Sequence, residues 1–212
     1  MVRFDTPVVL PRFLSAAKFD ALQREVGRLT KTERSYVPLH KKGATIAYSV
    51  IRRFAPAIVE FYRSPDQCRA VSDIAHLTVE PTPPRDENSL SVLVYDQAGD
   101  HIGWHYDHNF YRGRHFTVLL TIENHGHQAG GLSASCLLVK CHGEEQAIST
   151  PANTLVVFEG ARVLHKVVSI HAEERRVVLS MTYSRDPRIS LPREVARRFK
   201  DMAFFGLRAL WA

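Results

Sequence analysis

The sequence predicts a mainly β fold, a sandwich or barrel, with flanking helices. From residue 89 onward, short runs rich in β-branched and aromatic residues alternate with turns of Gly, Asn and Pro. Many short strands at such spacing are typical of all-β sandwiches and barrels. Helical periodicity is confined to the segments before and after these runs. The expected strands cover residues 90–95, 102–107, 116–123, 136–141, 154–158, 166–170 and 176–183.

Residues 1–88 supply the helices that we expect on one face or edge of this core. Apolar residues recur at helical spacing over residues 13–30, where Ser15 can cap the first turn. Two shorter helices are expected over residues 57–62 and 66–74. Between the first helix and these two, proline and glycine indicate irregular chain that ends in a short strand at residues 45–50.

The C-terminal segment, residues 191–212, is expected to form an amphipathic helix that Ser190 can cap. We expect its apolar stripe to dock onto the β-core or onto a second subunit, so a homodimer is left open. The stripe consists of Leu191, Val195, Phe199 and Met202.

No linker separates these parts, so we expect a single domain over residues 1–212. Within it, residues 1–88 form the helical N-terminal support, residues 89–184 the β-core, and residues 185–212 the C-terminal helix. A chain of 212 residues, 45% hydrophobic and 24% charged, is long enough to bury one sizeable core.

Composition also restricts the classes of function. The three cysteines show no C-x-x-C spacing, which indicates reduced thiols in a cytoplasmic protein. No apolar run resembles a secretory leader or reaches the ~20 residues of a membrane span. The net charge of +6 permits an anionic partner, but the basic residues form no stripe interleaved with aromatic residues. Binding of nucleic acid is therefore not favoured.

The motif that carries chemistry is His105-Tyr106-Asp107, followed by His165 at the start of a later strand. Side chains alternate along a strand, so His105 and Asp107 point the same way, and His165 can close the site from a neighbouring strand. Two imidazoles and one carboxylate can hold one face of Fe(II) and leave the other face open, as in non-haem iron oxygenases. Taken alone, His105 and Asp107 indicate only a hydrogen-bonded pair.

Arg175 and Arg176 begin the last expected strand and offer a partner for a carboxylate. The far carboxylate of a dicarboxylic keto acid that chelates iron would lie at about that distance. Arg176 shares its face with polar positions, which suits a pocket, whereas Arg175 shares its face with apolar positions, which suits packing. We favour Arg176, and the alternative is that both are surface arginines.

The run YDQAGDHIGWHYD at residues 95–107 resembles a segment of the Fe(II)/2-oxoglutarate-dependent dioxygenases, in particular the prolyl-hydroxylase-like branch. Further segments resemble the family in the same order, so the resemblance covers about residues 89–184. It implies a double-stranded β-helix core of the jelly-roll or cupin type. These further segments are TVLLTIEN, Gly130-Gly131, NTLVVFEGARVLHKV and RRVVLSMTY.

The resemblance implies that His105, Asp107 and His165 are the iron ligands. Iron halogenases of this fold lack the carboxylate, and its absence leaves a coordination position for chloride. Because Asp107 is present here, we expect hydroxylation or a related oxidation of a C–H bond rather than halogenation.

The resemblance also implies a site for the cosubstrate 2-oxoglutarate. Its distal carboxylate would meet Arg176, or Arg175 if the register shifts by one residue. Tyr95 lies where the family often has a pocket tyrosine. Thr121 lies where relatives often have a tyrosine hydroxyl, and since threonine is shorter, water or Tyr95 would complete that contact.

The loop after Asp107 lines the mouth of the active site in the family. We expect it to hold the substrate through Arg112 and Arg114, with His108 and Asn109 nearby, although solvent-exposed or ion-paired arginines would explain the same residues. A small substrate is therefore expected, a free amino acid or related carboxylate, oxidised with O2 while 2-oxoglutarate becomes succinate and CO2. The alternatives are an oxygenase that modifies nucleic acid or protein, and a non-catalytic metal-binding jelly-roll protein.

Overall fold

The structure is a computed structural model that describes residues 6–29, 33–37 and 41–205. The described helices are α1 (Ala16–Gly27), α2 (Tyr48–Phe54), α3 (Pro56–Arg63), α4 (Pro65–Ala75) and α5 (Leu191–Phe205), with one 3-10 turn, η1 (Ala129–Gly131). The described strands are β1 (Val8–Leu10), β2 (Glu33–Val37), β3 (Lys41–Ile46), β4 (Glu80–Pro81), β5 (Leu90–Tyr95), β6 (His101–His105), β7 (His115–His125), β8 (Leu137–Cys141), β9 (Glu144–Ile148), β10 (Leu155–Phe158), β11 (Leu164–Val167) and β12 (Arg175–Ser184).

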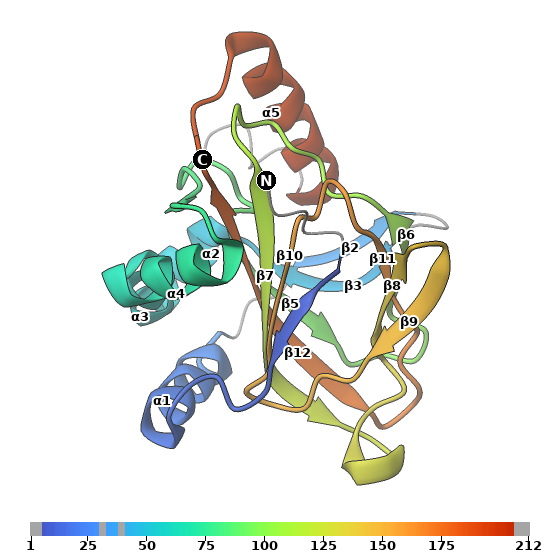
Figure 1. Ribbon diagram of the computed structural model, residues 1–212. Coiled ribbons are helices and arrows are strands. Elements are labelled where there is room, and N and C mark those ends of the chain that lie inside the picture. Colours follow the sequence, from blue (N-terminus) through green and yellow to red (C-terminus); the bar gives the residue numbers. More distant parts are fainter. Residues whose placement is uncertain (1–5, 30–32, 38–40, 206–212) are drawn as a thin grey trace.

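The strands form one antiparallel sheet that curls into a half-barrel. Hydrogen bonds connect them in the order β1-β10-β7-β12-β5-β3-β6-β11-β8-β9, while β2 pairs with β3 and β4 pairs with β12. Helices α1 to α4 lie on one side of the long strands β7 and β12, whereas β6, β8, β9 and β11 lie on the other side (Figure 1). The mainly β fold with flanking helices is therefore confirmed.

Two hydrophobic clusters lie on the two faces of the long strands. The larger cluster joins the helices to one face, where Ile58 and Val71 pack with alternate residues of β12 such as Leu179. The smaller cluster fills the inside of the half-barrel and includes Val139 and Phe158. Fully burying such a side chain stabilises the fold by roughly 1.5–3 kcal/mol. The side chains on the other face of β12 point into the half-barrel.

All seven expected strands are present, with ends that shift by at most a few residues. The expected strand at residues 45–50 is wrong, because β3 ends at Ile46 and α2 begins at Tyr48. The side chain of Tyr48 is buried in the larger hydrophobic cluster, and this tertiary packing stabilises a helix at this segment instead of a strand. The remaining strands were not expected, since they are short or polar.

The helices near the N-terminus agree with expectation. Helix α1 buries Phe19, Leu22 and Val26, and Ser15 precedes it without a side-chain hydrogen bond to the first turn. Helices α3 and α4 cover the two shorter expected segments. Among the described residues, no helix is long and apolar enough to cross a membrane.

Helix α5 lies at one end of the half-barrel (Figure 1). Its apolar stripe is exposed to solvent. Leu191 is 83% exposed and Phe199 61%, whereas Arg197 is 2% exposed. The expectation that the stripe docks onto the β-core is therefore wrong. The helix is held instead by polar contacts with other segments, because Arg197 faces Asp86, Glu194 pairs with Arg85, and Arg193 donates to the backbone carbonyl of Tyr111. The side chain of Met202 and residues 206–212 lie outside the described part of the chain.

Candidate active site

The three predicted metal ligands converge inside the half-barrel. His105 ends β6, and its Cα pairs directly with that of His165 on β11. The Nε2 atoms of His105 and His165 lie 3.6 and 3.8 Å from Oδ1 of Asp107. The candidate ligand atoms all lie within 4.8 Å of one another, so one metal ion could contact all three.

Backbone carbonyls orient both imidazole rings. Nδ1 of His105 lies 2.8 Å from the carbonyl oxygen of Gly103, and Nδ1 of His165 lies 2.8 Å from that of Val163. Because a carbonyl only accepts hydrogen bonds, each Nδ1 carries the proton that it donates. The Nε2 lone pairs of neutral rings are thereby directed toward the shared centre, as metal ligation requires.

The charges of the three groups also suit a divalent cation. Burial alone would raise the pKa of Asp107, but the contact with His105 and the nearby His165 hold that pKa far below its usual value. Burial lowers the pKa of His165, which favours the neutral imidazole. Burial likewise acts to lower the pKa of His105, but the adjacent Asp107 carboxylate outweighs it and raises the pKa. The cluster therefore offers an ionised carboxylate beside a neutral imidazole.

The three side chains line a pocket of about 220 Å³ between the two sides of the half-barrel. Its lining combines apolar side chains with polar groups that sequence reasoning did not single out. The apolar lining is Leu93, Ile102, Leu119, Leu137 and Val167, and the further polar lining includes Lys41, Asp86, Asn88, Ser91, Tyr111, His115, Thr117, Ser180 and Thr182.

Lys41 is the most informative of these additional residues. It is 8% exposed, and its Nζ donates to Oγ1 of Thr45 at 2.6 Å. Its positive charge acts to lower the pKa of His105, which places the ammonium within electrostatic reach of the centre. Sequence reasoning assigned this region to irregular chain, so no alternation pattern pointed Lys41 into the pocket.

Arg176 lies deep in the half-barrel and does not border the open pocket. It is 1% exposed, its guanidinium carbon lies 5.6 Å from the ring centre of Tyr95, and Nη2 lies 3.4 Å from Oγ1 of Thr150. Within the described part of the chain, Nε of Arg176 and the hydroxyl of Tyr95 are buried without a hydrogen-bond partner. Thr121 is also buried and shares a β7 face with the pocket residues Thr117 and Leu119.

Arg175 has the opposite surroundings. Its side chain is half exposed and forms ion pairs with Glu123 at 2.7 Å and with Asp96 at 3.4 Å. It therefore lies on the outer face of the sheet, with its charge already compensated by two carboxylates.

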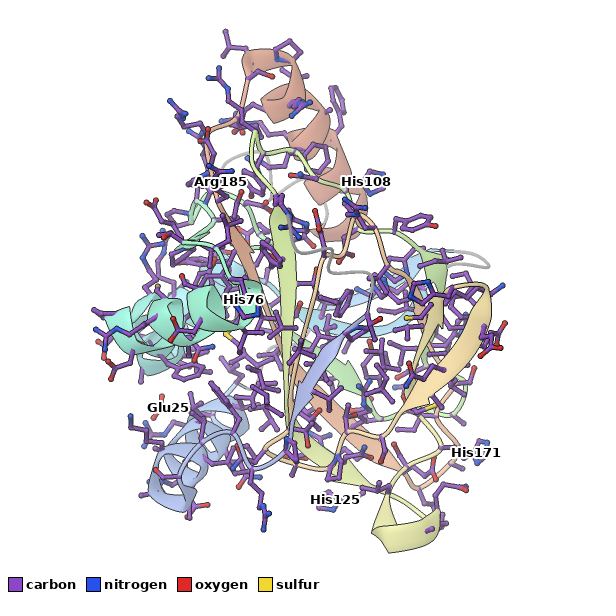
Figure 2. The ribbon with its side chains drawn as sticks, viewed as in Figure 1. Glu25, His76, His108, His125, His171 and Arg185 are labelled. Atoms are coloured by element: carbon purple, nitrogen blue, oxygen red, sulfur yellow. The ribbon has the colours of Figure 1, made fainter. Side chains whose placement is uncertain are left out.

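The loop after Asp107 contributes less to the pocket than the sequence indicated. Only His108 of the four expected substrate residues lines it, and His108 lies toward the end of the half-barrel that carries α5, opposite the end with His125 and His171 (Figure 2). Arg112 is exposed outside the lining. Arg114 binds Glu159 at 2.8 Å, and Asn109 closes its own loop by bonding the backbone of Tyr111 and Gly113.

Comparison with known proteins agrees with this arrangement. The family model of the 2OG-Fe(II) oxygenase superfamily matches residues 90–183, which include all three candidate ligands. The family model named Halogenase D matches residues 3–136, more than half of the chain. The chain therefore belongs to the family of the Halogenase D model. A search of curated proteins found no match.

Solved structures of these oxygenases share the fold of the chain. The α-ketoglutarate-dependent epimerase SnoN from nogalamycin biosynthesis has a TM-score of 0.67 at 14% identity, over 85% of this chain and 77% of SnoN. The carbocyclase SnoK from the same biosynthesis has a TM-score of 0.67 at 12% identity, over 90% and 85%. A Pseudomonas putida prolyl-4-hydroxylase has a TM-score of 0.59 at 18% identity, over 85% and 92%. The core is thus the double-stranded β-helix of this superfamily.

The superfamily model, the solved structures and the candidate metal ligands together indicate the class of enzyme and its cofactors. The protein is a 2OG-Fe(II) oxygenase, and enzymes of this superfamily use Fe(II), 2-oxoglutarate and O2. The described residues fit both groups. The nitrogen and carboxylate donors of the triad suit Fe(II). The buried Arg176, which has no acidic partner among the described residues, suits an anionic carboxylate.

Proposed function

We propose that the protein hydroxylates a C–H bond of a small carboxylate substrate, such as an amino acid, and that His105, Asp107 and His165 hold its iron. The observation that carries this proposal is the convergence of the three side chains from separate segments at one side of a partly apolar pocket. When bound, iron and 2-oxoglutarate would supply the oxidation of the C–H bond by O2, with release of succinate and CO2.

Arg176 is the proposed partner of the distal carboxylate of 2-oxoglutarate. A buried guanidinium is costly unless it is paired, and the nearest aromatic ring and hydroxyl do not neutralise its charge. A carboxylate could accept from the unpartnered Nε of Arg176 and from the hydroxyl of Tyr95. Thr121 on β7 would line the same end of the site, next to the distal carboxylate. Arg175 is less suited, because Glu123 and Asp96 already bind it.

Lys41 is the proposed partner of the substrate carboxylate. Arg112 and Arg114 lie outside the pocket lining, so the proposal of a carboxylate substrate does not depend on them. Lys41 supplies the ammonium group of the lining, and its bond to Thr45 holds that group in place. A cation beside an apolar surface would bind the carboxylate of a small molecule and leave its aliphatic part toward the triad. His108, which also lines the pocket, would contact the substrate as well.

The apolar lining has a separate role. Leu119, Leu137 and Val167 line the same pocket as the triad, where their apolar side chains would exclude water. A dry pocket strengthens the electrostatic contacts and protects a reactive centre from side reactions with solvent.

Halogenation is a second candidate, favoured by the match to the Halogenase D model. Asp107 argues for hydroxylation instead, because as an iron ligand its carboxylate would fill the position that chloride needs. If the protein halogenated its substrate, turnover in chloride buffer would yield a chlorinated product. We expect only oxygenated product, and mass spectrometry of the products in chloride and in chloride-free buffer separates the two reactions.

The test of the proposed function is a substrate screen with Fe(II), 2-oxoglutarate and air. The panel pairs amino acids and other small carboxylic acids with their amides, and succinate formation is measured. We expect faster succinate formation with one or more acids than with their amides, and none with metal-free protein. Failure of every candidate to raise 2-oxoglutarate turnover, together with retained metal binding, would favour the non-catalytic alternative.

A further inference from the structure

We infer that Thr117 and Gly160 are positioning residues that fix the orientation of the Asp107 carboxylate toward the metal. This inference rests on the metal site of the proposed function. It concerns two residues outside the triad, on β7 and in the turn between β10 and β11.

The two oxygens of Asp107 have different surroundings. Oδ1 is the oxygen that lies 3.6 and 3.8 Å from the two Nε2 atoms. Oδ2 accepts a hydrogen bond from Oγ1 of Thr117 at 2.5 Å. Because an ionised carboxylate only accepts, the hydroxyl of Thr117 must be the donor. The hydrogen bond thus holds Oδ2 away from the imidazoles and leaves Oδ1 as the ligand.

Thr117 is held firmly enough to orient its partner. It is 7% exposed in the long strand β7, where it pairs with Phe158 of β10 on one side and with Thr182 of β12 on the other. A hydroxyl fixed between two strands loses little further freedom when it donates, so most of the energy of the charge-assisted bond is available to orient Asp107.

Gly160 provides the space that the carboxylate fills. A Cβ atom placed on Gly160 would lie 2.1 Å from Oδ2 of Asp107 and 2.4 Å from Oγ1 of Thr117. The Gly160 carbonyl also accepts the backbone N–H of Asp107 at 2.9 Å. Gly160 therefore anchors the backbone of Asp107 and leaves room for its side chain. Any larger residue would have to displace the carboxylate or break its bond to Thr117.

The physical consequence is a pre-oriented ligand. Outer partners of metal ligands typically change metal affinity by about 10–100-fold when they are lost. Without the Thr117 hydroxyl, the Asp107 carboxylate can rotate and offer either oxygen or both. The free energy of metal binding must then include the entropic cost of fixing the carboxylate, so the affinity for the metal falls.

The experiment measures anaerobic Co(II) binding, by calorimetry and by the visible absorption of the bound ion. The variants are Thr117→Val, Thr117→Ser and Gly160→Ala, and the matched control is Gly27→Ala, whose added Cβ meets no atom within 4 Å. We expect Thr117→Val and Gly160→Ala to weaken Co(II) binding by about 10–100-fold and to change its spectrum. Thr117→Ser, which keeps the hydroxyl, and Gly27→Ala should bind like the wild type.

Melting curves of the metal-free proteins show which variants keep the fold. If folded Thr117→Val binds Co(II) with the affinity and spectrum of the wild type, the inference is overturned while the metal site stands. The inference is equally overturned if Thr117→Ser loses affinity as far as Thr117→Val does. If the wild-type protein itself binds no Co(II), the proposed function fails and the inference fails with it.

Discussion

The two arginines that begin β12 differ in burial and in partners, although they are adjacent in sequence. Arg176 points into the half-barrel beside Tyr95, and Arg175 points outward to Glu123 and Asp96. Strand alternation alone separates them, because a shift by one residue exchanges the two faces of a sheet. The same alternation turns Ser180 and Thr182 into the pocket with Arg176.

Arg176→Met should weaken 2-oxoglutarate binding by about 10–100-fold, because a hydrogen bond to a charged group is worth about 1.5–3 kcal/mol. The measurement is anaerobic titration of the Fe(II) protein with 2-oxoglutarate, followed by visible absorption. Arg175→Met is the control, and we expect its 2-oxoglutarate affinity to stay within about twofold of the wild type, since outer-face ion pairs contribute little. An Arg175→Met variant that lost affinity as far as Arg176→Met would contradict this assignment.

Lys41→Met should raise the KM for a carboxylate substrate while leaving 2-oxoglutarate affinity near that of the wild type. The reason is that the ammonium group of Lys41 lines the pocket, whereas Arg176 lies deeper. The loss of one charged contact corresponds to about 10–100-fold in KM. Steady-state kinetics with each compound varied in turn separates the two effects. If Lys41→Met weakened 2-oxoglutarate binding and Arg176→Met did not, the roles of the two cations would be exchanged.

The elements that the sequence predicts well are those with a strong local pattern. Strand β5 and the interior of β12 are short runs rich in β-branched and other apolar residues, and α1 repeats its apolar residues at helical spacing. Strand β3 and helix α2 were not recognised, because their side chains are buried through contacts with distant parts of the chain. Helix α5 was recognised as a helix, but its buried side was not, since that side carries Arg197, which faces Asp86, and not the apolar stripe.

Helix α5 provides an unusual stability prediction. Arg197→Met should destabilise the protein by about 3 kcal/mol, because it removes a buried guanidinium that faces the buried carboxylate of Asp86. Phe199→Ser on the exposed stripe of the same helix should change the free energy of unfolding by only about 0.5 kcal/mol. Urea unfolding measures both changes. A larger loss for Phe199→Ser than for Arg197→Met would show that the stripe is covered in the native protein.

The turn before β12 depends on one carboxylate. Glu174 accepts hydrogen bonds from the backbone N–H groups of His171, Ala134 and His127. Burial alone would raise the pKa of Glu174, but these N–H groups hold it below its usual value. A pKa that is lower in the folded state means that the carboxylate stabilises the fold above its ordinary pKa, and that this contribution is lost as the pH falls through the folded value.

Glu174→Gln should therefore destabilise the protein by about 1.5 kcal/mol near neutral pH, because a charge-assisted acceptor is replaced by a neutral one. The difference from the wild type should shrink as the pH falls below the ordinary carboxyl pKa of about 4.3, where the wild-type group becomes protonated. Thermal unfolding of both proteins across this pH range gives the comparison. A difference that stayed constant with pH would show that the carboxylate charge is not responsible.

At the scale of the whole molecule, the triad could be predicted from sequence because its spacing and its strand setting are local features. His105 and Asp107 lie two residues apart, and the run of β10 and its turn leads directly to His165. Lys41, Asp86 and Tyr111 could not be assigned to the pocket in this way, because only the curl of the sheet brings them together. Arg112 and Arg114 show the reverse, since nearness in sequence to Asp107 does not place them in the lining.

The central claim is that three side chains from two segments hold one iron ion that binds 2-oxoglutarate. The most direct measurement is anaerobic titration of the metal-free protein with Fe(II), followed by addition of 2-oxoglutarate and recording of the visible charge-transfer absorption. We predict one Fe(II) per chain and a new absorption band in the wild type, with both lost in His165→Ala. Wild-type protein that binds no Fe(II), or His165→Ala protein that binds it and gives the same band, would contradict the claim.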